Sequence, residues 1–570
     1  MSRTLCMLSL VVLLFYPTLS GAQNVVSTLE PEMREQIDTF YEEWEDPDRP
    51  GYASFVLHEG KVVYQRTFGK ERKLSESSIS PETLFNIGTL SHQQLVYGFF
   101  LLEKEGKVSL TDKLSTYLPA FSRFEEEIRL EHLLMHSSGL YDHRVLKTLL
   151  GWKPMAYITQ ADLLEMIDQQ STLSFSPGTD FAYSPTNIAL LVEVMEKVSE
   201  QAIADFMQER VYGPLDMENT HFVSDRTWTH AHLAQSYLAE GEELAEAHVG
   251  DLSYGRGNVY SNLQDMLKWE TFVLEAEGPQ KEIVERLSEV IQLPSGREYN
   301  MPEGKLTLGQ RYLNAERGMP ERYITSNRAG FAASVFSFPE QGFTGLVVSN
   351  DGTPYNGYLS METAYVLLED EFPEPATTDY SQLDIVNLST EQLAIHEGFY
   401  WDALGELSRQ IALVDDTLRY VRSPENSSPL VPLGENYFQM RTPWDDKIYI
   451  QFFHSEEGSE MTYTIGEADP IPFRRYEPLS LTTEELERVY AGKYWNEEYG
   501  IGFQLTAEGN RLTTNTANRI PISFQPIDTN TFSGTQWFMG SIEFTRNASS
   551  NITGFRLKHT GIRNLWLEKM

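Results

Sequence analysis

The residues best suited to chemistry lie in one stretch, PETLFNIGTLSHQQLVYGFFLLEKEGKVSLTDKL, residues 81–114. Its pattern predicts a short loop followed by a long helix that opens at about Thr89. His92 follows three residues later, so on a helix the two side chains would share a face. An imidazole is a competent base near neutral pH, and a hydroxyl beside it could attack a carbonyl group. The pair is a candidate nucleophile and base, although the methyl group of threonine crowds such an attack.

A second pair of histidines, His132 and His136 in EHLLMHSSGL, has the one-turn spacing of a zinc site. No glutamate lies between them in the metalloprotease pattern. The sequence therefore implies no metal and no other cofactor, and it favours local hydrogen bonding for His92, His136 and His143.

The elements that would position the first pair indicate an α+β domain over residues 30–372. EMREQIDTFYEEW is a short amphipathic helix, and GYASFVLHEGKVVYQRTFG is a hairpin that turns at Glu59-Gly60. Helical segments dominate from Thr89 to about Asp370, before the β-rich runs FAASVFSF and FTGLVVSND and a last helix. Strands at both ends with helices between them predict an antiparallel sheet whose terminal strands meet, flanked by helices.

Helical patterns nearly disappear beyond PEPATTDYSQ, a Pro/Thr-rich stretch at residues 373–382 that is typical of a linker. LSTEQLAIHEGFYW at Leu388 recurs as LTTEELERVYAGKYW at Leu481, and each copy sets a short capped helix before a Gly-aromatic strand. Alternating runs follow each copy. We predict two tandem lipocalin-like β-barrels, at residues 383–475 and 476–570, with a single larger β-sandwich as the alternative.

Seven phrases between residues 35 and 370 occur in the order found in beta-lactamase-related serine hydrolases; they include PETLFNIGTLS, HLLMHSSGLYDH, YSPTN and AGFAASVFSFPEQGFTGLVVSNDG. The chain resembles this family, which includes class C beta-lactamases, penicillin-binding DD-peptidases, D-aminopeptidases and certain esterases. The resemblance implies an α/β sandwich with a cleft that hydrolyses an amide or ester through an acyl-enzyme. The barrels resemble the D-aminopeptidase arrangement, which implies that they lie over the cleft and restrict entry.

The same resemblance assigns roles to individual positions. Thr89 stands where the family has its nucleophilic serine and His92 where it has the lysine, while Tyr183 matches the tyrosine base. Further positions are expected to line the cleft: Pro185, which replaces an asparagine, the displaced Asn187, Ser326 in the strand motif, and Gly330.

Two interpretations of this altered site follow. Phrases that maintain the fold are intact, whereas substitutions gather where the chemistry would occur. We therefore expect a pseudoenzyme that binds a peptide or other small ligand in the former cleft. An active, diverged hydrolase that forms an acyl-enzyme on Thr89 is the alternative, and a partner-binding protein that acts through its barrels is a second one.

Composition limits the partners and the location. A net charge of −38 repels phosphate backbones and anionic membranes, which argues against nucleic acid. Residues 1–23 have a basic start, the apolar run LCMLSLVVLLFY and a small-residue end, so they predict a cleaved signal peptide, with an uncleaved anchor as the alternative. The only cysteine, Cys6, lies within them. We expect a secreted or periplasmic protein with no membrane span in the mature chain, and the sequence leaves its oligomeric state open.

Overall fold

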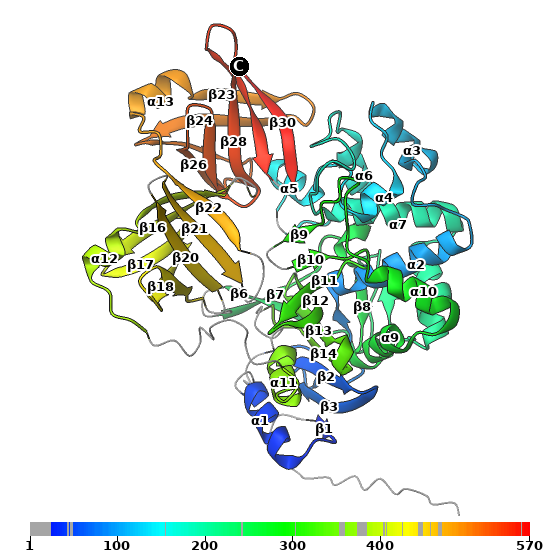
Figure 1. Cartoon of the computed structure of the whole chain (residues 1–570). Coiled ribbons are helices and arrows are strands. Elements are labelled where there is room, and N and C mark those ends of the chain that lie inside the picture. The colour runs from blue at the N-terminus through cyan, green and yellow to red at the C-terminus, as the bar shows by residue number, and fades with distance from the viewer. Residues whose placement is uncertain are drawn as a thin grey trace, which may run out of the picture.

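The computed structural model describes residues 24–42, 45, 50–153, 155–240, 243–301, 304–352, 359–372, 385–402, 405, 407–423, 426–442, 448–455, 458–465, 470–559 and 561–570. They form a sheet-and-helix domain followed by two barrels (Figure 1). The predicted signal peptide, residues 1–23, and the predicted linker, residues 373–382, lie outside the described residues.

The first domain is built on an antiparallel sheet that contains nine strands within the described residues. In spatial order these are β1 (Asn24–Ser27), β3 (Lys61–Phe68), β2 (Tyr52–His58), β14 (Phe343–Ser349), β13 (Phe331–Phe338), β12 (Met319–Arg328), β11 (Tyr312–Glu316), β10 (Gly304–Leu306) and β9 (Asn300–Met301). The expected meeting of the terminal strands is confirmed, because β2 pairs with β14. The expected hairpin is confirmed as well, with Glu59 and Gly60 at positive φ in its turn.

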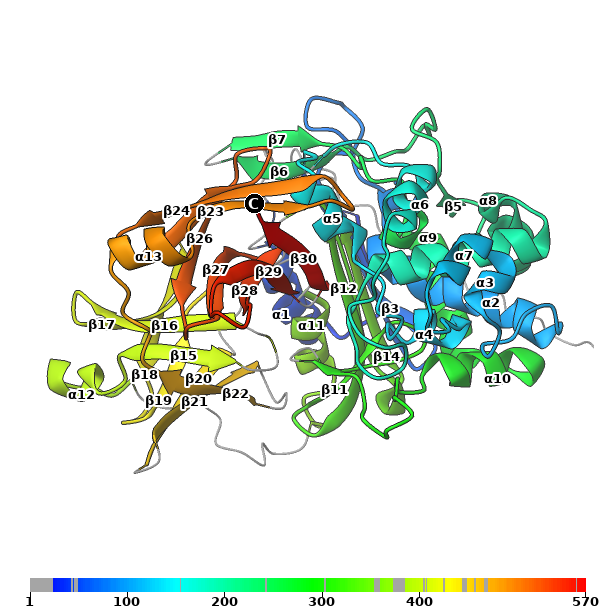
Figure 2. The ribbon, with the colours of Figure 1, turned by 90° about the horizontal axis from the view of Figure 1, so that it is seen from above.

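Helices cover both faces of this sheet, because successive side chains of its central strands point to opposite sides. In β2, Phe55 and Leu57 face one apolar cluster, whereas Tyr52 and Val56 face another. Figure 2 shows α1 and α11 on one side of the sheet and the larger helical layer on the other. The first layer comprises α1 (Pro31–Glu42) and α11 (Leu359–Leu367); the second includes α2 (His92–Lys104), α7 (Pro185–Ser199), α9 (Leu263–Glu275) and α10 (Gly278–Leu287).

Shorter elements complete the domain. The helices are α3 (Leu114–Tyr117), α4 (Leu130–Leu134), α5 (His143–Leu149), α6 (Gln160–Asp168) and α8 (Ile203–Met207). The 3-10 turns that matter for the site are η1 (Gly88–Ser91) and η5 (Tyr254–Arg256). Small sheets join β4 (Phe85–Asn86) and β5 (His221–Phe222) to β8 (Val259–Ser261), and β6 (Ser236–Glu240) to β7 (Glu243–Ala247).

The long helix that was expected to open at about Thr89 begins three residues later, at His92. Gly88 has a φ of +52°, and the Ser91 hydroxyl donates to the Gly88 carbonyl at 2.6 Å. These contacts close the tight turn η1, and the regular helix α2 starts only at His92. Thr89 therefore lies in a 3-10 turn and not within the helix.

The C-terminal part forms two closed antiparallel barrels, each with eight strands among the described residues, so the alternative of one β-sandwich is wrong. The first contains β15 (Gly398–Asp402), β16 (Leu407–Val414), β17 (Thr417–Ser423), β18 (Asn426–Pro432), β19 (Tyr437–Met440), β20 (Ile448–Ser455), β21 (Gly458–Ile465) and β22 (Ile471–Tyr476). The second contains β23 (Gly492–Asn496), β24 (Ile501–Glu508), β25 (Arg511–Asn515), β26 (Pro521–Pro526), β27 (Thr531–Gln536), β28 (Met539–Arg546), β29 (Ile552–His559) and β30 (Ile562–Lys569). Their likeness to lipocalins stays a prediction.

The repeated sequence phrase corresponds to a repeated structure. Each barrel is preceded by a short helix that begins with a capping box, α12 (Thr390–Ala394) after Ser389 and α13 (Thr483–Val489) after Thr482. The aromatic residue two positions after the Gly of each copy, Tyr400 or Tyr494, is buried inside its barrel. Side chains thus fill the barrel centres, as small barrels require.

The second barrel packs against the first domain beside the predicted cleft. The Asp142 backbone N–H donates to the Gly561 carbonyl at 2.9 Å, in the turn between β29 and β30. Arg563 pairs with Asp180 at 2.5 Å, and the ring of Tyr499 lies 6.4 Å from that of Tyr141. Among the described residues, no helix is both long and apolar enough to cross a membrane.

Candidate functional site

Both hydrogen-bond donors of Thr89 bind strand β12. Its hydroxyl donates to the Thr325 carbonyl at 3.2 Å, and its backbone N–H donates to the Ser326 hydroxyl oxygen at 3.1 Å. A Cβ atom at Gly88 would lie 2.0 Å from that same oxygen, so only glycine lets Ser326 approach. The structure thus brings the predicted positions 89 and 326 together, and β12 holds the candidate nucleophile.

His92 is buried, and its imidazole contacts the turn η5. Its Nε2 lies 3.1 Å from the Gly255 carbonyl in η5, and because a carbonyl only accepts, Nε2 carries the proton. Nδ1 has no hydrogen-bond partner among the described residues. Burial lowers the pKa of His92 to about 3, with smaller contributions from His136 and the nearby Arg256. The imidazole is neutral at pH 7, and no hydrogen bond joins it to Thr89 in the described part of the chain.

Tyr183 precedes α7 and is half-buried. Its ring centroid lies 4.5 Å from that of His136, and the Arg144 guanidinium carbon lies 5.9 Å from the Tyr183 centroid. Burial raises the pKa of Tyr183, and the charge of Arg144 offsets part of that rise. The phenol is therefore protonated at neutral pH.

The other predicted cleft residues are buried in structural contacts. The Asn187 carbonyl oxygen accepts from Ser138 at 2.6 Å, and its amide nitrogen lies 3.3 Å from His136 Nδ1. Pro185 occupies the first turn of α7. Gly330, with φ of +82°, lies against the backbone of Tyr237, where a Cβ atom would clash. Their role in binding stays a prediction.

A cluster of charged side chains begins at Arg144, beside Tyr183, and was not predicted from the sequence. Arg144 donates to Asp142 at 2.6 Å. Asp251 lies 3.6 Å from Arg256, 3.8 Å from Lys147 and 3.4 Å from His143. Burial acts to raise the pKa of both carboxylates, but the charge and hydrogen bonds of Arg144 lower the pKa of Asp142, and the hydrogen bond with His143 and the charge of Arg256 lower that of Asp251.

Arg328, on β12, adds a further buried cation. Its guanidinium donates to the carbonyls of Arg256 and Asp251 and to the side chain of Asn258. Burial and the charge of Arg256 lower its pKa to about 9. The cluster thus holds four cationic side chains, those of Arg144, Lys147, Arg256 and Arg328, against two carboxylates. A signal for it was present in the sequence, since position 144 directly follows one family phrase and position 256 directly precedes another.

The histidines considered for zinc have structural partners. His132 Nδ1 accepts from the backbone N–H of Arg129 at 3.1 Å. His136 Nε2 lies 2.7 Å from the Gln310 side-chain oxygen. In the described ranges, no group of three or more His, Cys, Asp or Glu side chains is arranged to hold a metal ion.

Comparison with known proteins places this geometry in a family. The family model named Beta-lactamase matches residues 37–368, more than half of the chain. The chain belongs to the beta-lactamase family. This confirms the resemblance drawn from the seven phrases.

Relatives of this beta-lactamase family member include penicillin-binding proteins and D-aminopeptidases. The chain is 25% identical over 228 residues to the putative penicillin-binding protein PbpX of Bacillus subtilis (40% of this chain, 55% of the relative). It is 26% identical over 243 residues to the D-aminopeptidase of Brucella anthropi (42% of this chain, 45% of the relative). The chain thus matches about half the length of these curated relatives.

A solved structure has the same fold. The octameric penicillin-binding protein homologue from Pyrococcus abyssi superposes with a TM-score of 0.52 at 20% sequence identity. The match covers 78% of this chain and 99% of that chain. At this identity the comparison supports the fold alone.

Proposed function

We propose that this beta-lactamase family member is catalytically impaired and binds a peptide-like or other small ligand in the former active-site cleft. The observation that carries the proposal is the pair of hydrogen bonds from Thr89 to β12. These bonds occupy the hydroxyl and the backbone N–H of Thr89, the two groups that acyl transfer would need.

Acyl transfer needs N–H donors aimed at the oxygen that becomes negative in the transition state. The nucleophile's own backbone N–H is a frequent donor, because the attacked carbon bonds to the adjacent side chain. Here the Thr89 N–H donates to Ser326, so a substrate oxygen would have to displace that hydroxyl. The Thr89 hydroxyl donates its proton to a backbone carbonyl, which cannot act as a base.

The base is also disabled. His92 is neutral, buried and hydrogen-bonded to Gly255, and it supplies no cation to stabilise an alkoxide. The phenol of Tyr183 is held in its protonated form by burial. Loss of one member of a catalytic unit typically lowers the rate by several orders of magnitude, and here nucleophile, lysine and strand motif are all changed.

The cationic side chains near Tyr183 indicate the chemical class of ligand that the cleft would bind. Side chains of Arg144 and Arg256 are 31% and 23% exposed, so both remain open to a ligand while their carboxylate partners are nearly buried. The excess of cations is unusual in a chain of net charge −38 and favours an anionic group. The carboxylate of a short peptide has that charge and matches the planar guanidinium fork.

Reactivity toward acylating reagents tests the proposal. Wild type, Thr89→Ala and Tyr183→Phe would be incubated with a fluorescent penicillin and with p-nitrophenyl esters. Thr111→Ala, which removes an exposed hydroxyl, serves as the control. We expect neither covalent labelling nor turnover above the level of Thr111→Ala or of the two site variants. Labelling or turnover that both Thr89→Ala and Tyr183→Phe abolish would instead establish the active hydrolase that uses Thr89.

We also propose that the second barrel restricts entry to the cleft. The turn at Gly561 contacts the backbone of Asp142, whose side chain holds Arg144. Arg563→Ala would remove the ion pair with Asp180 that fastens this turn. Faster association of a fluorescent tripeptide with the variant would support restricted entry, and an unchanged association rate would contradict it.

For the N-terminus, we propose that residues 1–23 are removed and that the mature chain acts outside the cytoplasm. The support is the basic start, apolar run and small-residue end of this segment. Intact-mass measurement of the protein purified from its host should show a start near residue 24; a mass that retains Met1 would contradict cleavage.

A further inference from the structure

A small cavity lined by polar and apolar side chains lies in the first domain, and neither Thr89 nor its partners Thr325 and Ser326 line it. It has a volume of about 30 Å³ and is lined by α2, α9, the end of α10, the turn at residues 307–311 and strands β12 to β14. About 10–15 Å³ suffices for one water, so the space holds roughly two or three waters or one small polar group. None of the predicted site residues lines it.

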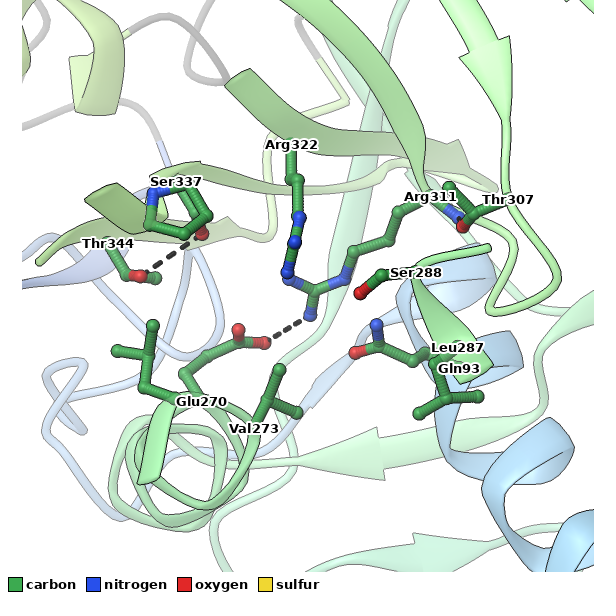
Figure 3. Close-up of a pocket in the computed structure, with 12 residues that line it drawn as sticks. Gln93, Glu270, Val273, Leu287, Ser288, Thr307, Arg311, Arg322, Ser337 and Thr344 are labelled. Atoms are coloured by element: carbon green, nitrogen blue, oxygen red, sulfur yellow. Dashed lines mark hydrogen bonds and ion pairs between the residues drawn. The ribbon is translucent and has the colours of Figure 1, made fainter. Parts of the chain in front are cut away.

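Arg311 is one of two guanidinium groups that enter this cavity (Figure 3). The residue is only 4% exposed, and one of its terminal nitrogens donates to Glu270 at 2.6 Å. Its Nε is buried and has no hydrogen-bond partner among the described residues. An unpaired buried donor is unfavourable, so this N–H leaves a position for an acceptor that the protein does not supply.

Arg322 is the second guanidinium and projects from β12 toward Arg311 (Figure 3). It is half-buried, and its side chain has no hydrogen-bond or ion-pair partner in the described part of the chain. Burial, together with the charge of Arg311, lowers the pKa of Arg322. With Glu270 as the one carboxylate lining the cavity, two cations face one anion. One further negative charge would balance the site.

Neutral donors surround the two arginines. The Gln93 side-chain oxygen accepts from Trp269 Nε1 at 3.1 Å, and because an indole nitrogen only donates, this bond fixes the amide with its NH₂ group on the other side. The Ser288 and Thr307 hydroxyls also line the cavity. Each can donate to an oxygen placed between the arginines.

We propose that this cavity binds a small oxyanion, a carboxylate or a phosphate group, between Arg311 and Arg322. Both headgroups present oxygens in the geometry that a guanidinium contacts through two parallel N–H donors. Such a group would accept from the unpaired Nε and neutralise the excess charge, and the cavity's size limits it to one headgroup. The site does not depend on the proposed function of the Thr89 cleft.

Isothermal titration calorimetry on the full-length protein at pH 7 tests this site. Sodium phosphate and sodium acetate would be titrated separately, with sodium chloride at matched ionic strength as the reference. The variants are Arg322→Gln and, as a control with the same change in charge, Arg474→Gln, whose side chain is 85% exposed on the first barrel. We expect saturable binding of at least one of the two anions, weakened at least tenfold by Arg322→Gln and unchanged by Arg474→Gln.

Each result of the titrations either supports or refutes the anion site. Binding of phosphate alone or acetate alone would identify the headgroup. No saturable binding of either anion, or equal affinities for wild type and Arg322→Gln, would overturn the proposal. If Arg322→Gln does not fold, Arg322→Lys replaces it in the test, because lysine keeps the positive charge but lacks the planar guanidinium. Weaker anion binding by Arg322→Lys than by wild type would support the site. Unchanged binding would refute it.

Discussion

Replacing His92 by glutamine should flatten the dependence of the first domain's stability on pH. The glutamine amide can donate to the Gly255 carbonyl as Nε2 does, so the variant keeps that contact and removes only the titrating group. Comparing this variant with wild type tests whether the imidazole of His92 is a buried structural group or an accessible base.

The expected size follows from proton linkage. In the unfolded chain a histidine has a pKa near 6.5, whereas burial lowers that of native His92 to about 3. Below pH 6.5 the unfolded chain therefore binds a proton that the native chain does not. The free energy of unfolding is therefore independent of this histidine above about pH 6.5 and decreases as the pH falls from 6.5 toward 3. Between pH 7 and pH 5 this amounts to about 2 kcal/mol.

Native-state hydrogen exchange of the amides of α2 measures the relevant free energy of opening, because it reports the first domain separately from the barrels. Wild type should lose about 2 kcal/mol more than His92→Gln between pH 7 and pH 5. His248→Gln, at an exposed histidine, controls for loss of an imidazole. Identical pH dependences for wild type and His92→Gln would refute the buried state and return His92 to the candidates for a catalytic base.

Three further substitutions test contacts that shape the site and the barrels. Gly88→Ala should lower the free energy of unfolding by about 2 kcal/mol or more, because φ is +52° and the new Cβ would meet Ser326; a melting temperature equal to wild type would contradict the turn. Asn187→Ala should cost roughly 2 kcal/mol by leaving the buried Ser138 hydroxyl without its acceptor, which urea unfolding measures, and a loss below about 0.5 kcal/mol would count against that contact. Thr482→Ala should cost about 1 kcal/mol through the lost cap of α13; unchanged exchange rates in that helix would show that the cap contributes nothing.

The sequence was sufficient to predict the sheet and the barrels because their signals are local. The β-rich runs FAASVFSF and FTGLVVSND, the Glu59-Gly60 turn and the two capping boxes are each contained within a few residues. The helix start was placed three residues early because apolar spacing cannot distinguish a 3-10 turn from the first turn of an α-helix.

The chemistry of the site was harder to predict because it depends on residues distant in the chain. Thr89 donates to an atom 236 residues away, so no local pattern could show that its hydroxyl and N–H were engaged. Likewise, the spacing predicted that His92 would share a face with Thr89, but it could not show that the imidazole is hydrogen-bonded to Gly255, 163 residues away. The charged cluster assembles from three separate segments, at residues 142–147, 251–256 and 328, and only its proximity to the family phrases could be seen in the sequence.

The pairing of β2 with β14 has a consequence for synthesis of the chain. Gly51 accepts from Ser349, a partner 298 residues later, so the central sheet cannot close until most of the first domain has left the ribosome. At about 5–20 residues per second this takes roughly 15–60 s. Throughout that time the N-terminal hairpin exposes an unpaired strand edge to other nascent chains, which makes it the segment where chaperone protection matters most. Each barrel, in contrast, closes from strands that emerge within about 80 residues of one another.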